Sequence, residues 1–256
     1  MNASTRLALI AATSAIAITT AMDTTGYSVF SALPLIALLA FFWWRGNLSH
    51  REVGFTLGKR NTYWVALIYP VVVIGLLAGV AYLAGAAETT DTAWVETARH
   101  IALAASVGVL MVAITEEGFF RGVLWALLER GGLSPQRLLG ATTALFVLWH
   151  LSAVLLDTGF NPPRSQLPVY LVNAVLLGYI WGSMRLLSGS VWVPAVCHSL
   201  WNALAYELFA FGEKVGALGV VDTWLYAPEV GLGGLVLNGL VALLLWRYQF
   251  GGRKPE

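Results

Sequence analysis

Long apolar runs recur along the whole chain and are separated by short polar connections. Each run has roughly 17 to 25 residues, which is enough for a helix to cross a hydrocarbon core about 30 Å thick. Turn sequences such as Gly131-Gly132 and Asn161-Pro162-Pro163 fall between the runs. The pattern predicts eight membrane segments, at about residues 7–22, 28–44, 63–86, 99–128, 138–156, 168–187, 190–211 and 231–249.

These segments are expected to be helices. Lipid offers no partner to unpaired backbone groups, and the alternating pattern of membrane β-strands is absent from this sequence. We therefore predict an all-α, polytopic transmembrane helical bundle of about eight helices. The connections leave no room for a soluble domain, so residues 1–256 are predicted to form a single integral membrane domain.

Composition agrees with this fold class. The chain is 58% hydrophobic and 11% charged, whereas about a quarter of the residues in a soluble domain are charged. The net charge of +1 argues against a basic surface for nucleic acid, so the lipid bilayer is the expected partner. The single cysteine, Cys197, cannot form an intrachain disulfide and is expected to fill space in the core.

The distribution of charge predicts the orientation. Basic residues concentrate in alternate connections: Arg45, Arg51, Lys59 and Arg60; Arg130 and Arg137; Arg185; and Arg247, Arg253 and Lys254. The intervening loops hold the acidic residues Asp23, Glu88, Asp91, Glu96, Asp157, Glu213, Asp222 and Glu229, with Arg164 and Lys214 as the basic exceptions. Because basic loops stay in the cytoplasm, both termini are predicted to be cytoplasmic. An alternative for the first segment is a cleaved signal peptide that follows Arg6.

Two carboxylates and a guanidinium interrupt the fourth apolar run, at Glu116, Glu117 and Arg121. An ionised side chain at the centre of a membrane helix costs at least about 2.5 to 3.5 kcal/mol, so such residues usually face partners or water and serve function. Glu117 and Arg121 are four residues apart and can pair on one helix face. Glu116 is rotated by about 100° from Glu117 and has no such partner, which suits it to act as a general base. A buried structural clamp remains the alternative for Glu117 and Arg121.

Two further segments carry histidines. Phe146 and His150 share a face of the fifth segment, and His198 is followed four residues later by Asn202 on the seventh. A rise of about 1.5 Å per residue from the predicted cytoplasmic helix ends places Glu116, His150 and Asn202 about 18 Å deep and His198 about 12 Å deep. These side chains are therefore predicted to meet in one layer.

Other polar residues in or near the membrane are assigned to structure. His50 and His100 are expected to be solvated or interfacial. Glu207, Asn173 and Asn238 are expected to form interhelical hydrogen bonds, since such residues in apolar helices usually do so. Gly178 and Gly182 form a G-x-x-x-G pattern that allows close helix packing within the bundle, an interpretation favoured over dimerisation.

Three protease chemistries do not fit the sequence. The H-E-x-x-H motif of zincins is absent, as is the G-x-S-G motif that an intramembrane serine protease would need. Every aspartate lies in a predicted outer loop, so the pair required by an aspartyl protease is missing. A mechanism based on glutamate and histidine remains.

The three motifs Glu116-Glu117-x-x-x-Arg121, Phe146-x-x-x-His150 and His198-x-x-x-Asn202 occur in this order on separate segments. Together they resemble the CPBP family of intramembrane proteases. That family comprises type II CAAX prenyl endopeptidases and bacterial relatives, also called Abi proteins, some of them linked to bacteriocin processing or self-immunity. The similarity covers about residues 100–210. It implies a multi-pass protein, expected in a prokaryotic plasma membrane, that hydrolyses a membrane-associated protein or peptide.

The resemblance also implies roles for individual residues. Glu116 would be the base, His150 would help to hold the attacking water, and His198 and Asn202 would stabilise the oxyanion, while Glu117 and Arg121 would brace the site or assist in polarising it. In a competing version, Glu116, His150 and His198 hold a divalent metal such as zinc, and Glu117 is the base. Spacing does not decide between the two versions.

Two other classes of function remain open. One is a membrane scaffold or immunity protein that binds a partner in this pocket without cleaving it. The other is a proton-coupled transporter, because membrane Glu and His residues also form proton relays. The internal repeats and broken helices common in transporters are not visible in the sequence. The identity of the substrate and the oligomeric state are not determined by these patterns.

Overall fold

The computed structural model describes residues 1–89, 92–156, 158–210 and 214–251. No β-strand occurs in these ranges. The longer helices are α1 (Ala3–Thr24), α2 (Pro34–Arg45), α4 (Thr62–Leu83), α5 (Trp94–Ile114), α7 (Pro135–Leu155), α8 (Leu167–Ser188), α9 (Trp192–Leu208) and α11 (Leu232–Phe250). The shorter elements are η1 (Ser28–Phe30), α3 (His50–Val53), η2 (Glu117–Leu124), α6 (Trp125–Arg130), η3 (Arg164–Gln166) and α10 (Thr223–Tyr226).

Seven helical stretches of the described chain are long and apolar enough to cross a membrane: Ala3–Thr24, Ser28–Arg45, Thr62–Leu83, Trp94–Arg130, Pro135–Leu155, Arg164–Ser188 and Leu232–Phe250. The remaining predicted segment, 190–211, corresponds to α9, whose 17 residues form a helix about 26 Å long at 1.5 Å per residue. The predicted all-α, polytopic membrane bundle is confirmed, with segment ends within a few residues of the sequence-based boundaries except at the two segments described below.

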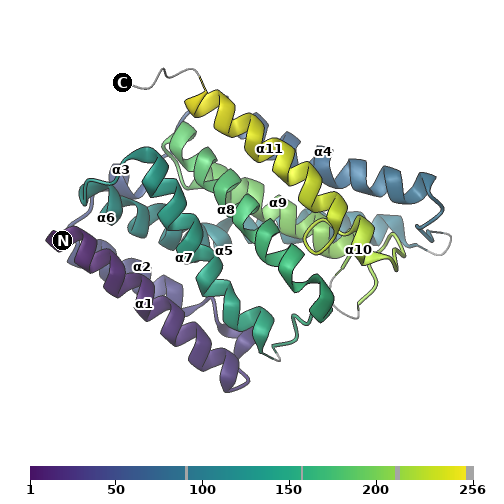
Figure 1. The fold of residues 1–256 in the computed structure, drawn as a ribbon, viewed down its shortest axis with the longest axis horizontal. Coiled ribbons are helices and arrows are strands. Elements are labelled where there is room, and N and C mark those ends of the chain that lie inside the picture. The colour runs from purple at the N-terminus through teal and green to yellow at the C-terminus, as the bar shows by residue number, and fades with distance from the viewer. Residues whose placement is uncertain (90–91, 157, 211–213, 252–256) are drawn as a thin grey trace.

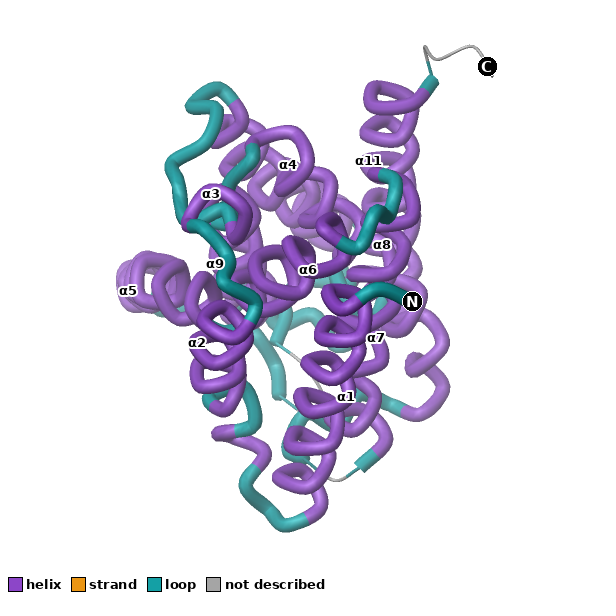
Figure 2. Tube along the Cα trace, turned by 90° about the vertical axis from the view of Figure 1, so that its left-hand side faces the viewer, coloured by secondary structure: helices purple, strands orange, loops and turns teal. Residues whose placement is uncertain are grey.

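The long helices run side by side, and the beginning of α1 and the end of α11 lie at the same end of the bundle (Figure 1). Helix α9 packs against α4, α5 and α8, so its side chains reach the interior. Helix α5 lies at the edge of the bundle (Figure 2), and Val112 and Ala113 near its C-terminus are its buried residues. The three sequence motifs are therefore carried by elements that meet inside the bundle.

Two predicted segments differ in their internal structure. The segment predicted at 28–44 is not one α-helix, because η1 is followed by a turn and α2 begins at Pro34. Proline is tolerated in the first turn of a helix but not in its interior, which explains the restart. The segment predicted at 99–128 is also not one α-helix: α5 ends at Ile114, and the chain continues as the π-helix η2.

Two charged residues assigned to loops are buried instead. Asp23 lies in the last turn of α1 with 4% of its surface exposed, so the prediction of an outer-loop residue was wrong. Arg185, also assigned to a loop, is buried in the last turn of α8 and donates hydrogen bonds to the carbonyl oxygens of Arg121 and Glu52. Among the other charges that indicated orientation, Asp91, Asp157, Glu213, Arg253 and Lys254 lie outside the described residues.

The two asparagines assigned to interhelical hydrogen bonds make them, whereas the Glu207 carboxylate lies 3.8 Å from His100, beyond hydrogen-bond distance. Asn238 on α11 donates to Asn173 on α8 at 2.8 Å, and Tyr69 on α4 donates to Asn238 at 2.7 Å. Gly178 and Gly182 face α7 so closely that an added Cβ would lie 3.1 and 3.0 Å from side chains of that helix. Close packing within the bundle is thus confirmed for both glycines. Cys197 is fully buried, as expected for a core residue.

Candidate active site

The first part of the site lies where α5 gives way to η2. Thr115 ends α5 with φ −109° and ψ −98°, so Glu116 and Glu117 follow a break in the helix instead of continuing it. Glycine is required here, because a Cβ on Gly118 would lie 2.3 Å from the carbonyl oxygen of Ala113. Single π-helical turns inside α-helices occur frequently at functional sites. After the break, the adjacent carboxylates of Glu116 and Glu117 lie in different environments.

Glu117 is fully buried and held by two partners. Arg121 Nη1 donates to Glu117 Oε1 at 3.2 Å, and His198 Nδ1 lies 3.0 Å from the same oxygen. Arg121 also donates to the carbonyl of Gly178 at 3.1 Å and stacks its guanidinium 4.1 Å from the centre of the Phe146 ring. The predicted pairing of Glu117 with Arg121 is present, and it extends to His198 on another helix.

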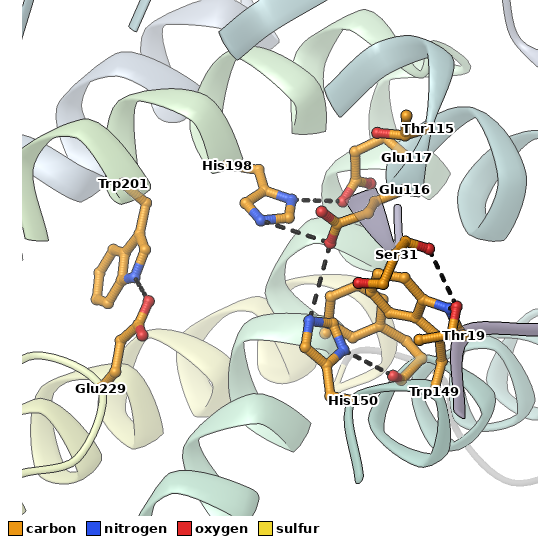
Figure 3. A network of polar contacts seen from close by, with 12 residues as sticks. Thr19, Ser31, Thr115, Glu116, Glu117, Trp149, His150, His198, Trp201 and Glu229 are labelled. Carbon is orange, nitrogen blue, oxygen red and sulfur yellow. Dashed lines mark hydrogen bonds and ion pairs between the residues drawn. The ribbon is translucent and has the colours of Figure 1, made fainter. Parts of the chain in front are cut away.

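Glu116 faces the two histidines that the sequence predicted to meet it. Its Oε2 lies 3.8 Å from His150 Nε2 and 4.0 Å from His198 Nε2 (Figure 3). Both distances are longer than a direct hydrogen bond. They leave space for a water molecule that bridges the three side chains. The Glu116 side chain retains 16% exposure, whereas that of Glu117 is at 0%. Of the two carboxylates, Glu116 is therefore the accessible one.

Both imidazoles are oriented by their Nδ1 atoms. His150 Nδ1 lies 2.9 Å from the carbonyl oxygen of Phe146, which can only accept, so Nδ1 carries the proton. The His198 ring stacks on Trp181 with centroids 3.7 Å apart, and its Nδ1 faces Glu117. In both residues Nε2 is thus left to face Glu116. Packing and hydrogen bonds together fix these two nitrogens toward one point.

Asn202 lies one helical turn beyond His198 on α9 and lines a cavity with His150 and His198. Its side-chain amide makes no hydrogen bond with another residue in the described part of the chain, so it is free to donate into the cavity. Six residues were predicted as site residues, and all six lie in this region: Glu116, Glu117, Arg121, His150, His198 and Asn202. Among the residues assigned to structure, Asn173 also lines this cavity, whereas His100 lies beside Glu207, with its Nδ1 3.8 Å from Glu207 Oε2.

Sequence reasoning missed one acidic residue of this cavity. Glu229 was assigned to an outer loop, but its side chain lines the cavity beside His198 and Asn202. Trp201 Nε1 donates to Glu229 Oε1 at 2.9 Å (Figure 3). Nothing in the sequence around Glu229 signals this position, because the contact joins a loop to a helix 28 residues away.

The site can be compared with what a metal ion requires. Two histidines and a glutamate are ligands of some catalytic zinc sites, and metal-bound histidines commonly donate their second N–H to an oxygen, as both do here. In a tetrahedral zinc site with bonds of about 2.0 to 2.1 Å, two ligand atoms lie roughly 3.3 Å apart. Here Glu116 Oε2 lies 3.8 Å from His150 Nε2 and 4.0 Å from His198 Nε2, which is longer. No group of three or more His, Cys, Asp or Glu residues in the described ranges is arranged to hold a metal ion. As placed, the side chains do not fit zinc.

Comparison with known families supports the resemblance seen in the motifs. Residues 98–204 match the family model described as type II CAAX prenyl endopeptidase, Rce1-like. The matched region contains all six predicted site residues, so the central part of the chain is similar to this family. Neither a curated protein nor a solved structure matches the sequence.

Proposed function

We propose that this protein is an intramembrane endopeptidase that cleaves membrane-associated proteins or peptides with water activated by Glu116 and His150. The observation that carries the proposal is the convergence of Glu116 on His150 and His198, from three separate helices, inside the region that matches the protease family. Charged groups inside a membrane bundle are costly and are usually retained for function.

In the proposed reaction, Glu116 takes a proton from water that is also held by His150. The resulting hydroxide attacks the carbonyl carbon of the scissile peptide bond. Asn202 and His198 donate hydrogen bonds to the developing oxyanion, whose stabilisation in a dry site contributes strongly to catalysis. When the carbon–nitrogen bond breaks, Glu116 returns its proton to the leaving amine, which restores the carboxylate.

The role of His198 as a donor depends on its neighbours. Its Nδ1 donates to Glu117, so Nε2 donates to the oxyanion only when the imidazole is protonated. Arg121 pairs with the Glu117 carboxylate, and Glu117 in turn faces His198 Nδ1. Glu117 and Arg121 therefore serve as positioning residues that hold His198 in the orientation needed.

The matched family suggests which substrate class to test first. The matched family description names CAAX prenyl endopeptidases, so a membrane peptide with a prenylated end is the first substrate class to test, and a bacteriocin-related peptide is the second. With both termini cytoplasmic, the protein would work as a multi-pass enzyme of a prokaryotic plasma membrane.

The test is a comparison of new peptide ends in membrane proteomes from cells with wild type, with Glu116→Gln or with the matched control Glu207→Gln. Glu116→Gln keeps the shape but removes the basic oxygen, so turnover should fall by about 100-fold to 10,000-fold. On a substrate found in this way, Asn202→Ala should slow single-turnover cleavage by about 100-fold to 1,000-fold with little change in binding. Near wild-type cleavage by folded Glu116→Gln would reject the assignment. A binding phenotype that survives this change would favour the non-catalytic partner protein.

The zinc version makes a separate prediction. If Glu116, His150 and His198 hold a metal ion, purified active protein should contain about one metal ion per chain and lose activity to a strong chelator. We expect instead that a preparation shown to be free of metal retains full activity, since the proposed reaction needs only side chains and water. Loss of activity that returns on adding zinc would establish the metal version.

A further inference from the structure

A polar cavity extends from the catalytic residues toward the end of the bundle opposite the chain termini. Its lining includes His198 and Asn202 at one end and Tyr170, Tyr206 and Glu229 at the other. The cavity volume is about 40 Å³, and one water needs roughly 10 to 15 Å³ by this measure when several polar partners surround it. The space therefore suits a few water molecules and not a peptide.

Glu229 is held at this cavity by a network that spans several helices. Trp201 donates to its carboxylate at 2.9 Å, and Tyr206 adds a second side-chain hydrogen bond. The Glu229 carbonyl accepts from Asn173 Nδ2 at 2.9 Å, and Asn173 in turn is held by Asn238. A loop carboxylate that is fixed from its backbone and from its side chain has a defined position.

This carboxylate lacks a compensating charge of its own. No cation in the described part of the chain forms an ion pair with Glu229. Burial raises the pKa of Glu229, while the hydrogen bond from Trp201 acts in the opposite direction. A buried carboxylate such as Glu229 needs further hydrogen-bond donors. Water is a donor small enough to enter a cavity of this size.

Hydrolysis inside a membrane also needs a supply of water, which lipid does not provide. We propose that Glu229 is a water-positioning residue that keeps the cavity hydrated, and that the water for hydrolysis passes from this chamber to Glu116 by way of His150, which lines it. The first half of the inference concerns binding of water alone. The second half rests on the proposed function.

Hydration can be tested by the accessibility of an introduced thiol. Ala174 lines the cavity, while Val172 on the same helix is 52% exposed on the outer surface of the bundle. With Cys197 replaced by serine, each position is changed to cysteine in full-length protein in vesicles and treated with Ag⁺, a thiol-reactive cation small enough to enter a cavity of this size. The thiols left unreacted are counted after denaturation. The thiolate is the reacting form and needs a hydrated site, so Ala174→Cys should react at least about tenfold faster than Val172→Cys.

The role of Glu229 is tested in the same background. Glu229→Leu should slow labelling of Ala174→Cys to the rate of Val172→Cys, whereas Glu229→Gln, which retains polar atoms, should keep most of it. Tyr206→Phe provides a milder variant in case the leucine change impairs folding. The inference would be overturned if Ala174→Cys reacted as slowly as Val172→Cys. It would also be overturned if its rate were unchanged by the two substitutions of Glu229 and by Tyr206→Phe.

Cleavage assays separate this inference from the proposed function. On a substrate cleaved by wild type, Glu229→Leu should lower kcat with little change in KM, and Glu229→Gln should restore part of it. If Glu116→Gln abolishes cleavage but labelling does not depend on Glu229, only the inference about Glu229 fails. If labelling depends on Glu229 but Glu116→Gln still cleaves, the chamber stands and the proposed peptidase mechanism fails.

Discussion

Two adjacent glutamates have different surroundings, and this difference explains how each can serve the site. Glu117 is fully buried and bonded to both Arg121 and His198. Removing one partner of a buried charge pair typically costs about 3 to 5 kcal/mol, because the other charge is left without compensation. Among the described residues, the ion-pair partner nearest to Glu116 is His150 at 3.8 Å, and the Glu116 side chain keeps some exposure. The clamped residue is thus placed to support the candidate site, and the more accessible one is placed to meet water.

A third glutamate, outside the membrane segments, gives a pH prediction. Glu52 accepts hydrogen bonds from Arg130 and from Ser49, which lower its pKa from 4.5 to about 2. Its contribution to stability is therefore complete above about pH 4.5 and is lost as the pH falls toward 2. Because the pair is about one third exposed, we expect about 1 kcal/mol at most.

The measurement is thermal unfolding in detergent at several pH values. Glu52→Gln should lower the Tm at pH 7, and its difference from wild type should shrink as the pH approaches 2. Glu96→Gln removes a more exposed carboxylate that pairs with Arg99 and serves as the control, with a smaller change. A Glu52→Gln effect that stays constant over this pH range would contradict the assignment.

At the scale of elements, the break at Thr115 and the π-helix η2 set the direction of the candidate site groups. Glu116 and Glu117 both follow the break, so their orientation no longer continues that of α5. Glu117 reaches Arg121 and His198, while Glu116 faces His150. The carbonyl oxygen of Arg121, within η2, accepts from Arg185 at 2.8 Å, which ties η2 to α8. The wide turn is thus braced from a neighbouring helix.

Gly118→Ala tests this geometry. The added methyl would lie 2.3 Å from the carbonyl oxygen of Ala113 and 2.7 Å from Leu39 Cδ1, so the backbone of the break must shift. We expect a loss of about 1 to 3 kcal/mol in stability, as for other overpacked sites, and a larger loss in cleavage. Gly140→Ala on α7 is the matched control, because a Cβ there meets no atom within 4 Å. Equal behaviour of the two variants in unfolding and cleavage assays would argue against a special role for the break.

The sequence predicted the elements better than their junctions. Apolar runs of membrane-spanning length predict helices because lipid permits few alternatives. The depth argument also brought Glu116 to the same layer as His150 and His198, since helical rise is regular. The break before Glu117 and the arrival of Glu229 were not predictable, because both depend on contacts between distant parts of the chain. Asp23 was missed for a simpler reason, since α1 extends two residues beyond the predicted end at residue 22.

At the scale of the whole molecule, the two ends of the chain constrain its orientation. The beginning of α1 and the end of α11 lie at one end of the bundle (Figure 1), as expected for an even number of crossings. Arg130, at the end of the stretch Trp94–Arg130, forms its ion pair with Glu52 on α3 next to the turn at Gly46 and Asn47. Glu88 belongs to the loop after α4 and donates its backbone N–H to Leu218, in the loop after α9. Basic and acidic connections therefore gather at different ends of the molecule.

This arrangement predicts the topology of the protein in its membrane. Because basic connections stay in the cytoplasm, reporters fused after Arg60 and after Lys254 should both report cytoplasm, while one fused after Glu88 should report the outside. Two reporter proteins are fused at each position, one active only in the cytoplasm and one active only outside it. Each position is therefore assigned by one positive and one negative signal. Changing Lys59 and Arg60 together to glutamine should weaken the cytoplasmic signal after Arg60, since these two charges contribute to retention of that loop. Outside signals at Arg60 and Lys254 together with a cytoplasmic signal at Glu88 would invert the orientation, and the cavity that contains Glu229 would then extend toward the cytoplasm.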